Sequence, residues 1–308
     1  MLLEHMGTGG ARAKNGHPRI GIMGLGVVGS AVRGYFEAQG HRPRLYDPYL
    51  ALGSRQEINK ARVIFVCVPT LYRERGGFDP TAVEEAIALL KPGKIVVIKS
   101  TVLPGTTDAL QRRHPDQRVL FNPEFLREAT AYEDFFRPDR QIVGCTDLSW
   151  PVAGEVMALL PKAPFMRVVA AAEAEMSKYV TNAFLAVKVS FANEIYDLCT
   201  ALGINHEAVR PLVAADARIG PSHLDVFYDG YRGYGGKCLP KDVRSLMDLA
   251  RAAGVSLRLL RAAHDVNQAP LSTVRSRKKE EKLDEARGNH EQPGSASPHP
   301  GSGRRLVA

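Results

Sequence analysis

Short, continuous apolar runs separated by helical periodicity dominate the first half of the chain. Residues 19–24 (RIGIMG) predict a buried strand that runs into a glycine turn, and the following stretch has the spacing of a helix that Gly40 can end. Further apolar runs lie at 42–47, 63–70 and 94–100. Continuous runs rich in β-branched residues are typical of parallel strands that are covered on both faces. The pattern therefore predicts an α/β architecture.

The alternation of strand and helix continues through the middle of the chain. Asp79 as N-cap and Pro80 at the first helical position predict a helix at TAVEEAIALL, and Gly93 follows it. The segments RVLFN and QIVGC supply further strands. Together with the runs before them, these segments predict one Rossmann-like parallel sheet flanked by helices.

The pattern and composition of the sequence change after about residue 170. From Ala171 to Leu202 there is no proline or glycine, and apolar residues recur at helical spacing. Gly203 ends this helix of about 30 residues, which would be roughly 45 Å long at 1.5 Å per residue. A helix of this length usually spans a domain boundary or a dimer interface. We expect more helix up to about Pro270, interrupted by a glycine-rich loop at 230–236.

These patterns divide the chain into four segments. We expect a disordered extension at 1–18, the sheet domain at 19–169, and a helical domain with one long helix at 170–270. Residues 271–308 are charged and then rich in Gly, Ser and Pro, so we expect a disordered tail there. The expected fold class is α/β, a Rossmann-like parallel sheet domain followed by an all-helical domain.

Charge and cysteine content narrow the classes of function. The net charge is +8, but residues 271–308 supply +3 of it, and no dense basic run with interleaved aromatics exists elsewhere. We therefore expect no nucleic-acid partner. The four cysteines form no C-x-x-C pair, so we expect neither a disulfide framework nor a metal site, and a reducing cytoplasm fits best. No run of 18 apolar residues exists, so we expect no membrane segment.

A glycine motif follows the first predicted strand. Gly24, Gly26 and Gly29 form G-x-G-x-x-G between strand and helix, where the backbone can approach a pyrophosphate at the helix N-terminus. Asp47 ends the second strand, where a carboxylate can bond a ribose diol and repel a 2′-phosphate. The motif and its context favour NAD as cofactor. The alternative is a glycine turn in an unrelated α/β domain.

Cys238 differs from the other cysteines in its setting, RGYGGKCLPKD. Glycines before it permit close approach of a ligand, and Pro240 after it can open a helix. A helix N-terminus together with Lys237 and Lys241 would lower the pKa of the thiol, as a covalent nucleophile requires. From these residues alone, a nucleophile and a structural thiol both remain open. Cys67, Cys145 and Cys199 are expected to be buried structural thiols.

Several polar pairs admit both a functional and a structural interpretation. Lys178 and Asn182 share one face of the long helix. They are interpreted either as substrate-binding residues or as solvated side chains. Glu124 and Glu128 follow a strand end, where ligands bind in such sheets, although an exposed helical face explains their spacing equally well. The Ser-Thr pair at 100–101 also follows a strand. These two residues either contact a cofactor or stabilise a turn.

Six blocks of sequence together resemble the UDP-glucose/GDP-mannose dehydrogenase family. In order, they are GIMGLGVVG, VCVPT, KSTVLPGTT, NPEFLRE, AEMSKYVTNAFLAVKVSFANE and GYGGKCLPKD. The resemblance covers roughly residues 19–270, and the NPEFLRE and GYGGKCLPKD blocks are more similar to the UDP-glucose branch than to the N-acetylmannosamine branch. It implies oxidation of the C6 alcohol of a nucleotide sugar to a carboxylate with two NAD molecules in sequence.

The resemblance also implies roles for individual residues. Cys238 would form a thiohemiacetal and then a thioester, and Lys178 with Asn182 would hold the oxygen substituent. Asp242 would orient or activate water in the first oxidation, and Glu124 would act on water in thioester hydrolysis. The expected cofactor contacts are Gly24, Gly26, Gly29, Asp47, Thr70, Thr101 and Glu128. The expected substrate contacts are Lys178, Asn182, Gly235 and Lys241. A homodimer through the long helix is also expected.

Two departures from the family pattern matter. Only 15 residues (48–62) separate Asp47 from the next strand, where family members usually carry a longer helical stretch. The family's C-terminal UDP-binding domain is expected to be missing, because the charged tail stands in its place. Two alternatives therefore stay open: a non-catalytic or partner-dependent NAD-binding relative, and a 3-hydroxyacid-type dehydrogenase that performs one hydride transfer.

Overall fold

The computed structural model describes residues 19–228, 231–236 and 238–268. The predicted extension at 1–18 and the predicted tail at 271–308 lie outside the described residues. Within the described ranges the chain divides into two compact units. The first unit comprises the residues up to Lys188 together with Gly235–Arg261.

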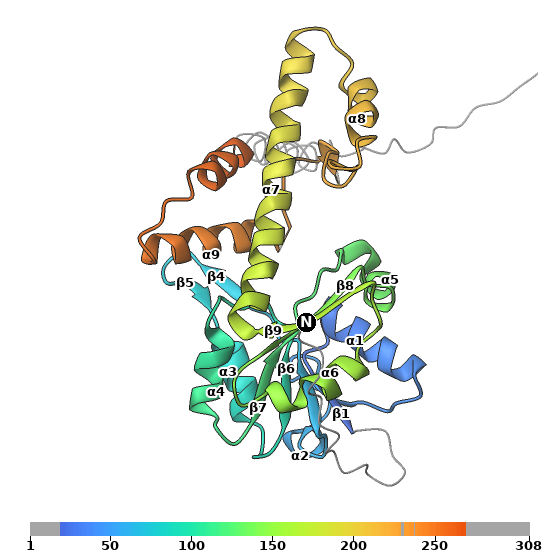
Figure 1. Ribbon diagram of the computed structural model, residues 1–308, viewed down its shortest axis with the longest axis vertical. Helices are drawn as coiled ribbons and strands as arrows, with labels where there is room; N and C mark the ends of the chain where they lie inside the picture. Colours follow the sequence, from blue (N-terminus) through green and yellow to red (C-terminus); the bar gives the residue numbers. More distant parts are fainter. Residues whose placement is uncertain (1–18, 229–230, 237, 269–308) are drawn as a thin grey trace, which may run out of the picture. The chain divides into compact units, whose positions relative to one another are not determined.

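A seven-stranded sheet forms the centre of the first unit (Figure 1). The strand order is β2-β1-β3-β6-β7-β8-β9. The strands are β1 (Ile20–Met23), β2 (Arg44–Tyr46), β3 (Val63–Val66), β6 (Ile95–Ile98), β7 (Arg118–Phe121), β8 (Arg140–Cys145) and β9 (Phe165–Ala170). All four residues of β1, β3 and β6 are buried, as their continuous apolar runs predict. The predicted Rossmann-like α/β class is confirmed.

The sheet is parallel except at one pair of strands, because β7 and β8 are antiparallel. The reason lies in the connection between them. A parallel crossover needs a helix that carries the chain back along the strand, and α5 (Ala131–Phe136) has only six residues. Strand β8 therefore begins near the edge at which β7 ends, and it runs in the opposite direction.

Helices cover both faces of this sheet (Figure 1). One face packs against α1 (Val27–Ala38), α5 and α6 (Ala153–Leu159). The other packs against α2 (Arg55–Ile58), α3 (Thr81–Ala88) and α4 (Thr106–Arg113). Two short 3₁₀ turns, η1 (Glu128–Thr130) and η2 (Trp150–Val152), precede α5 and α6. Successive strand residues alternate between the two apolar clusters, so both cores follow from the pleat of the strands.

A small hairpin that the sequence did not indicate connects the sheet domain to α9 (Leu239–Ala252). Its strands are β4 (Leu71–Arg73) and β5 (Gly77–Asp79). The Tyr72 hydroxyl donates a 2.6 Å hydrogen bond to Asp248, and Arg244 donates to Glu74 at 2.6 Å. These contacts fix the helix whose N-cap is Cys238.

Helix α7 (Ala171–Ala201, 31 residues) confirms the predicted long helix. Its residues from Val189 belong to the second unit, with α8 (His206–Ala214) and a hairpin of β10 (Phe227–Tyr228) and β11 (Tyr231–Arg232). The expectation of an all-helical second domain is therefore wrong in one detail. Phe227 packs edge-on against Tyr196 of α7, and this contact gives the hairpin an apolar support.

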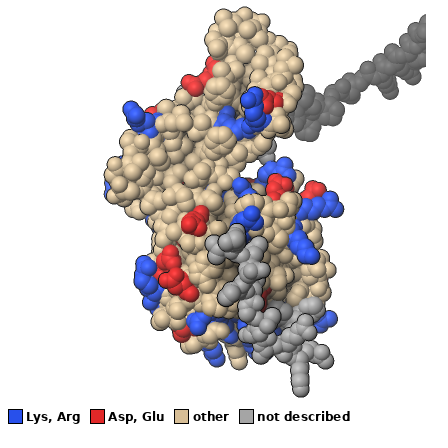
Figure 2. Space-filling view, in the orientation of Figure 1, with Lys and Arg blue, Asp and Glu red and all other residues tan. Residues whose placement is uncertain are grey.

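Two surface properties bear on function. None of the helices in the described ranges combines the length and the apolar character that crossing a membrane requires. On the face shown in Figure 2, basic and acidic side chains are interspersed and do not gather into one basic area.

Glu175 is a buried carboxylate that connects α7 to the start of α4. It accepts hydrogen bonds from the backbone N–H of Gly105 (2.6 Å) and from the N–H and hydroxyl of Thr107 (2.8 and 2.6 Å). Helix α4 has no side-chain cap of its own, so Glu175 satisfies its first N–H groups from another helix. Burial raises the pKa of Glu175 to about 7, against the hydrogen bonds from Thr107 and Gly105 that lower it.

We expect the stabilising contribution of Glu175 to decrease between pH 4.5 and 7. The ordinary pKa of 4.5 applies to the unfolded chain, so the folded chain binds more protons in this window and loses stability as the pH rises. The loss amounts to about 3 kcal/mol at most. Urea unfolding of wild type and Glu175→Gln across this range measures the difference, with exposed Glu173→Gln as the control. Parallel pH dependences for wild type and Glu175→Gln would contradict the assignment.

Candidate active site

The glycine turn after β1 has the geometry of a nucleotide-binding loop. Gly24 has φ of 84°, and a Cβ there would lie 2.8 Å from the carbonyl oxygen of Cys67. A Cβ at Gly29 would lie 1.9 Å from the carbonyl oxygen of Gly24, so neither position accepts a side chain. Gly26 is the N-cap of α1, has no side-chain cap bond, and faces open space. The first N–H groups of α1 are therefore available to an anion.

Asp47 supports this turn from the end of β2. Its side chain is buried, and one carboxylate oxygen accepts the N–H of Leu25 at 2.8 Å. The other accepts the N–H groups of Tyr49 (3.0 Å) and Leu50 (3.3 Å). A carboxylate has about four lone-pair sites, so these three bonds leave room for about one more donor, such as a ribose hydroxyl. The contact with a ribose stays a prediction.

The other predicted cofactor residues lie at the ends of strands or beside α1. The Thr70 hydroxyl, after β3, donates to the carbonyl oxygen of Thr101, after β6, at 2.9 Å. Glu128 lines a pocket of about 460 Å³ together with Val27 and Ser30 of α1. Ligands bind at the carboxyl ends of strands in open sheets of this kind. The turn, the open helix terminus and this pocket thus fit a dinucleotide.

Lys178 and Asn182 are buried on the face of α7 that looks toward α9 and the loop after β7. Lys178 forms a 2.8 Å ion pair with Glu124, and the Asn182 amide donates to Asp242 at 2.6 Å. The solvated alternative for this pair is wrong, because Lys178 is 4% and Asn182 6% exposed. Their spacing of four places both side chains in one buried polar cluster.

Glu124 and Glu128 do not share a helical face, so that alternative is also wrong. Glu124 lies in an irregular loop, where its second oxygen accepts the N–H of Leu126 at 2.8 Å. Glu128 begins η1 and lines the pocket beside α1. Burial alone would raise the pKa of Glu124, but the charge and hydrogen bond of Lys178 hold it below the usual value.

Cys238 is exposed at the N-cap of α9, one turn before Asp242. The expectation of a lowered thiol pKa is wrong. Removal of the thiol from bulk water and the negative charge of Glu124 raise the pKa of Cys238, and Lys178 and Lys241 oppose them without reversing the direction. The charges that act on the thiol come from segments that are distant in the sequence. The loop after β7, α7 and α9 therefore form one electrostatic site.

The remaining predicted residues of the cysteine loop are Lys241, Gly235 and Lys237. Lys241 donates to the second oxygen of Asp242 at 2.6 Å, so that buried carboxylate has two donors. Gly235 is half-buried in the loop three residues before Cys238. Lys237 lies outside the described residues.

Sequence reasoning missed two basic residues of this region. Lys99, at the end of β6, is 2% exposed and donates to the side chain of Asn122 at 2.6 Å. Burial lowers the pKa of Lys99 to about 8. Its position beside the Ser-Thr pair at 100–101 was a usable signal, since a charged residue ending an apolar strand is unusual. Arg140 gave no signal, because its place depends on the direction of β8.

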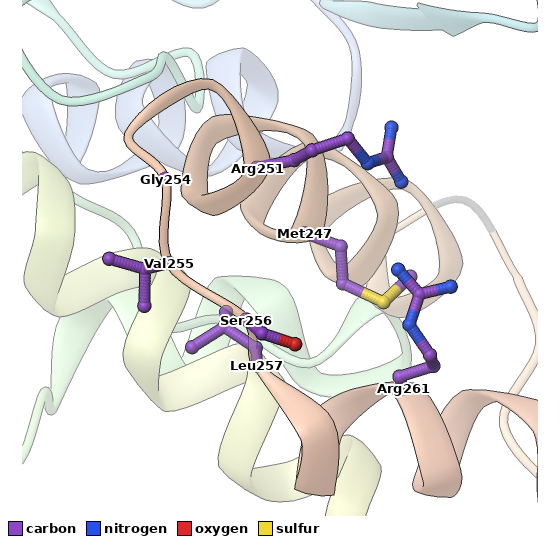
Figure 3. A pocket seen from close by; sticks show the side chains of 7 residues that line it. All are labelled: Met247, Arg251, Gly254, Val255, Ser256, Leu257 and Arg261. Carbon is purple, nitrogen blue, oxygen red and sulfur yellow. The ribbon is translucent and has the colours of Figure 1, made fainter.

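The cysteines other than Cys238 are buried, as expected of structural thiols. Within the described ranges, no three His, Cys, Asp or Glu side chains are grouped to hold a metal ion. A second pocket, of about 280 Å³, lies at the end of α9, where Met247 stands between Arg251 and Arg261 (Figure 3). It contains none of the predicted site residues.

Comparisons with known proteins agree with this geometry. Residues 172–269 match the model of the UDP-glucose/GDP-mannose dehydrogenase family, central domain, and residues 50–157 match that of the NAD binding domain. The chain belongs to the UDP-glucose/GDP-mannose dehydrogenase family. The glycine turn lies upstream of the matched part of the NAD binding domain, and the cysteine loop lies within the central domain.

Several named relatives are UDP-glucose 6-dehydrogenases. The UDP-glucose 6-dehydrogenase of Pseudomonas aeruginosa is 35% identical over 302 residues, which cover 81% of this chain and 65% of that protein. That of Haloferax volcanii is 33% identical, covering 80% of this chain and 69% of that protein. A UDP-glucose dehydrogenase structure from Pyrobaculum islandicum aligns with a TM-score of 0.74 at 30% identity, covering 84% of this chain and 70% of that one. The chain thus spans about two thirds of these relatives.

We expect alkylation of Cys238 to require a higher pH than alkylation of a free cysteine, whose pKa is about 8.5. In Glu124→Gln the midpoint should move to lower pH, because the variant removes a negative charge and frees the cation of Lys178. Peptide mass spectrometry after iodoacetamide pulses at increasing pH measures the midpoint. Glu128→Gln, which changes a carboxylate in the pocket beside α1, is the control. A midpoint below that of free cysteine, or an upward shift in Glu124→Gln, would contradict the assignment.

Proposed function

We propose that this chain is an NAD-dependent nucleotide-sugar 6-dehydrogenase. It oxidises the C6 alcohol of UDP-glucose, or of a similar nucleotide sugar, to a carboxylate in two steps. The observation that carries the proposal is the buried polar cluster beside Cys238, in which the Lys178–Glu124 ion pair acts on the thiol. The similarity to proteins named UDP-glucose 6-dehydrogenase favours this substrate.

The first oxidation converts the alcohol to an aldehyde. Lys178 and Asn182 hold the C6 oxygen, and the cation of Lys178 stabilises the negative charge that develops as the proton leaves. Asp242 orients the water that receives this proton, since its carboxylate is itself held by two donors. NAD, when bound, accepts the hydride released in each oxidation.

The second oxidation passes through the cysteine. The thiolate of Cys238 adds to the aldehyde carbon, and Lys178 stabilises the oxyanion of the resulting thiohemiacetal. Loss of the second hydride leaves a thioester on the sulfur. Glu124 takes a proton from water, which attacks the thioester, releases the carboxylate and restores the thiolate.

A second candidate function is that of an NAD-binding relative that is non-catalytic or depends on a partner for part of its substrate site. Remote binding energy supports both affinity and turnover in enzymes of this kind, so such a protein binds NAD without oxidising the sugar on its own. The 3-hydroxyacid-type alternative ranks last, because a single hydride transfer needs no cysteine at the N-cap of α9.

We also propose a homodimer through α7. This helix exposes a stripe of large apolar side chains whose spacing of four or seven places them on one face. In the first unit they are Met176, Val180 and Phe184, and in the second Phe191 and Leu198. Each is at least 38% exposed, and an apolar stripe of this kind is typical of a protein interface.

We expect limiting UDP-glucose to yield two NADH per sugar consumed, with GDP-mannose tested beside it. Two hydrides leave in the full oxidation, so absorbance at the NADH band against sugar consumed gives the ratio. A ratio of one would indicate a single-step dehydrogenase. No NADH, with NAD binding confirmed by calorimetry, would favour the partner-dependent or non-catalytic alternative.

Cys238→Ala should stop acid formation while NAD binding survives. The variant removes the sulfur on which the second oxidation takes place, so no thioester can form. Chromatography of the sugar product and calorimetry with NAD measure the two effects. Cys199→Ala, which changes a buried cysteine of α7, is the matched control. Acid formation by Cys238→Ala would overturn the role of the thiol.

Phe191→Glu should convert a dimer into a monomer, because it places a charge at the centre of an apolar interface. Light scattering coupled to size-exclusion chromatography gives the mass in solution. Thr200→Glu, on the opposite face of α7, should leave the mass unchanged. A monodisperse monomer for the wild type would refute the dimer.

A further inference from the structure

Strand β8 begins opposite the loop that carries Glu124. Phe121 pairs with Gly144 in the antiparallel register of β7 and β8, and the same register continued past β7 brings Phe125 opposite Arg140. The side chains meet there, since the Arg140 guanidinium lies 3.6 Å from the centre of the Phe125 ring. At this distance the planar group is stacked on the ring.

Arg140 connects this loop to the turn of α7 that carries Lys178 and Asn182. Its guanidinium donates to the Thr181 hydroxyl at 3.3 Å, and Thr181 immediately precedes Asn182. Phe125 also lies near a second cation, because the Lys178 ammonium is 5.6 Å from its ring centre. The ring therefore contacts two cations, one of which is paired directly with Glu124.

The other end of the same loop is also held by β8. The Asn122 amide donates to the side chain of Gln141 at 2.9 Å and to the carbonyl oxygen of Ile142 at 2.7 Å, and its oxygen accepts from Lys99. Glu124 thus lies between two anchored neighbours. The anchor at Asn122 is a set of hydrogen bonds, whereas the anchor at Phe125 is the stack on Arg140.

We propose that Arg140 is a positioning residue for Glu124. By holding the Phe125 ring and Thr181 together, it keeps the Glu124 carboxylate against Lys178 and directed at the thioester on Cys238. The inference deepens the proposed function and rests on it for the role of Glu124. Arg140 acts through Phe125 and takes no part in the bonds that form or break.

The chemistry of the side chain explains why an arginine is needed here. A guanidinium is planar and less strongly hydrated than an ammonium, so it can stack on a ring and still donate from its edge. Burial lowers the pKa of Arg140, and this desolvation is tolerated by a group that stays charged under all ordinary conditions. A lysine would keep the charge but lose the stack.

The test compares wild type, Arg140→Lys and the control Arg137→Lys, which changes an exposed arginine three residues earlier. Rapid mixing with saturating NAD and UDP-glucose follows NADH formation. For Arg140→Lys we expect a burst approaching two NADH per site and then a steady rate ten- to a hundredfold below wild type, because misplaced Glu124 slows hydrolysis after both hydrides have left. The KM for NAD and the Arg137→Lys traces should match wild type.

A double-variant cycle with Phe125→Leu guards against a general folding defect. Phe125→Leu alone should give the same burst, and the double variant should be no slower than either single variant, since both changes remove one stack. Rates that fall independently in the double variant, a slower rate without a burst, or wild-type kinetics in Arg140→Lys would each overturn the proposal.

Hydrogen exchange separates this proposal from the proposed function. Residues 122–127 of unliganded Arg140→Lys should exchange faster than those of wild type and of Arg137→Lys. If wild type makes no NADH, the proposed function fails, and the exchange rates alone then decide whether Arg140 holds the loop. Unchanged exchange in Arg140→Lys would overturn the positioning role in either case.

Discussion

Two largely buried ion pairs at one edge of the sheet constrain the rest of the first unit. Lys178 pairs with Glu124, and Lys241 pairs with Asp242. Burying such charges costs several kcal/mol per ion unless each partner is well placed and hydrogen-bonded. The loop after β7, α7 and the start of α9 must therefore meet with little tolerance, and the hydrogen bond from Tyr72 to Asp248 helps to hold α9 in that position.

The charge balance of this cluster favours an anion. The buried lysines Lys99 and Lys178 and the half-buried Lys241 stand against two carboxylates, Glu124 and Asp242. Lys99 has neutral oxygens of Asn122 as partners, and burial lowers its pKa to about 8. The surplus positive charge is a fixed field that favours an oxyanion formed beside it. In the proposed reaction such an oxyanion forms next to Cys238.

The sequence predicted most of the fold because the information is local. Strands β1, β3 and β6 are continuous apolar runs, and α7 has neither proline nor glycine, so each element can be found without knowledge of its neighbours. The direction of β8 could not be found, because an apolar run reads the same in a parallel and in an antiparallel strand. Arg140 was missed for the same reason.

The structure brings together several residues that the sequence singled out, but the sequence did not predict their energetics. The spacing of Lys178 and Asn182 indicates a shared face, yet their burial depends on α9, which lies about sixty residues further along the chain. Lys237 and Lys241 are visible in the sequence of the cysteine loop, whereas burial and the charges of Glu124 and Lys178 act on Cys238 only in the folded structure. The sequence therefore predicted the wrong sign for the shift of its pKa.

A raised thiol pKa is compatible with the proposed order of steps. During the first oxidation a neutral Cys238 adds no second negative charge beside the alkoxide, so Lys178 can stabilise that oxygen fully. In the proposed mechanism, once the aldehyde has formed, addition of the sulfur would move the negative charge onto the oxygen beside Lys178. The thiol would then need to lose its proton at the moment of addition and not before, and the same lysine would serve both oxidations.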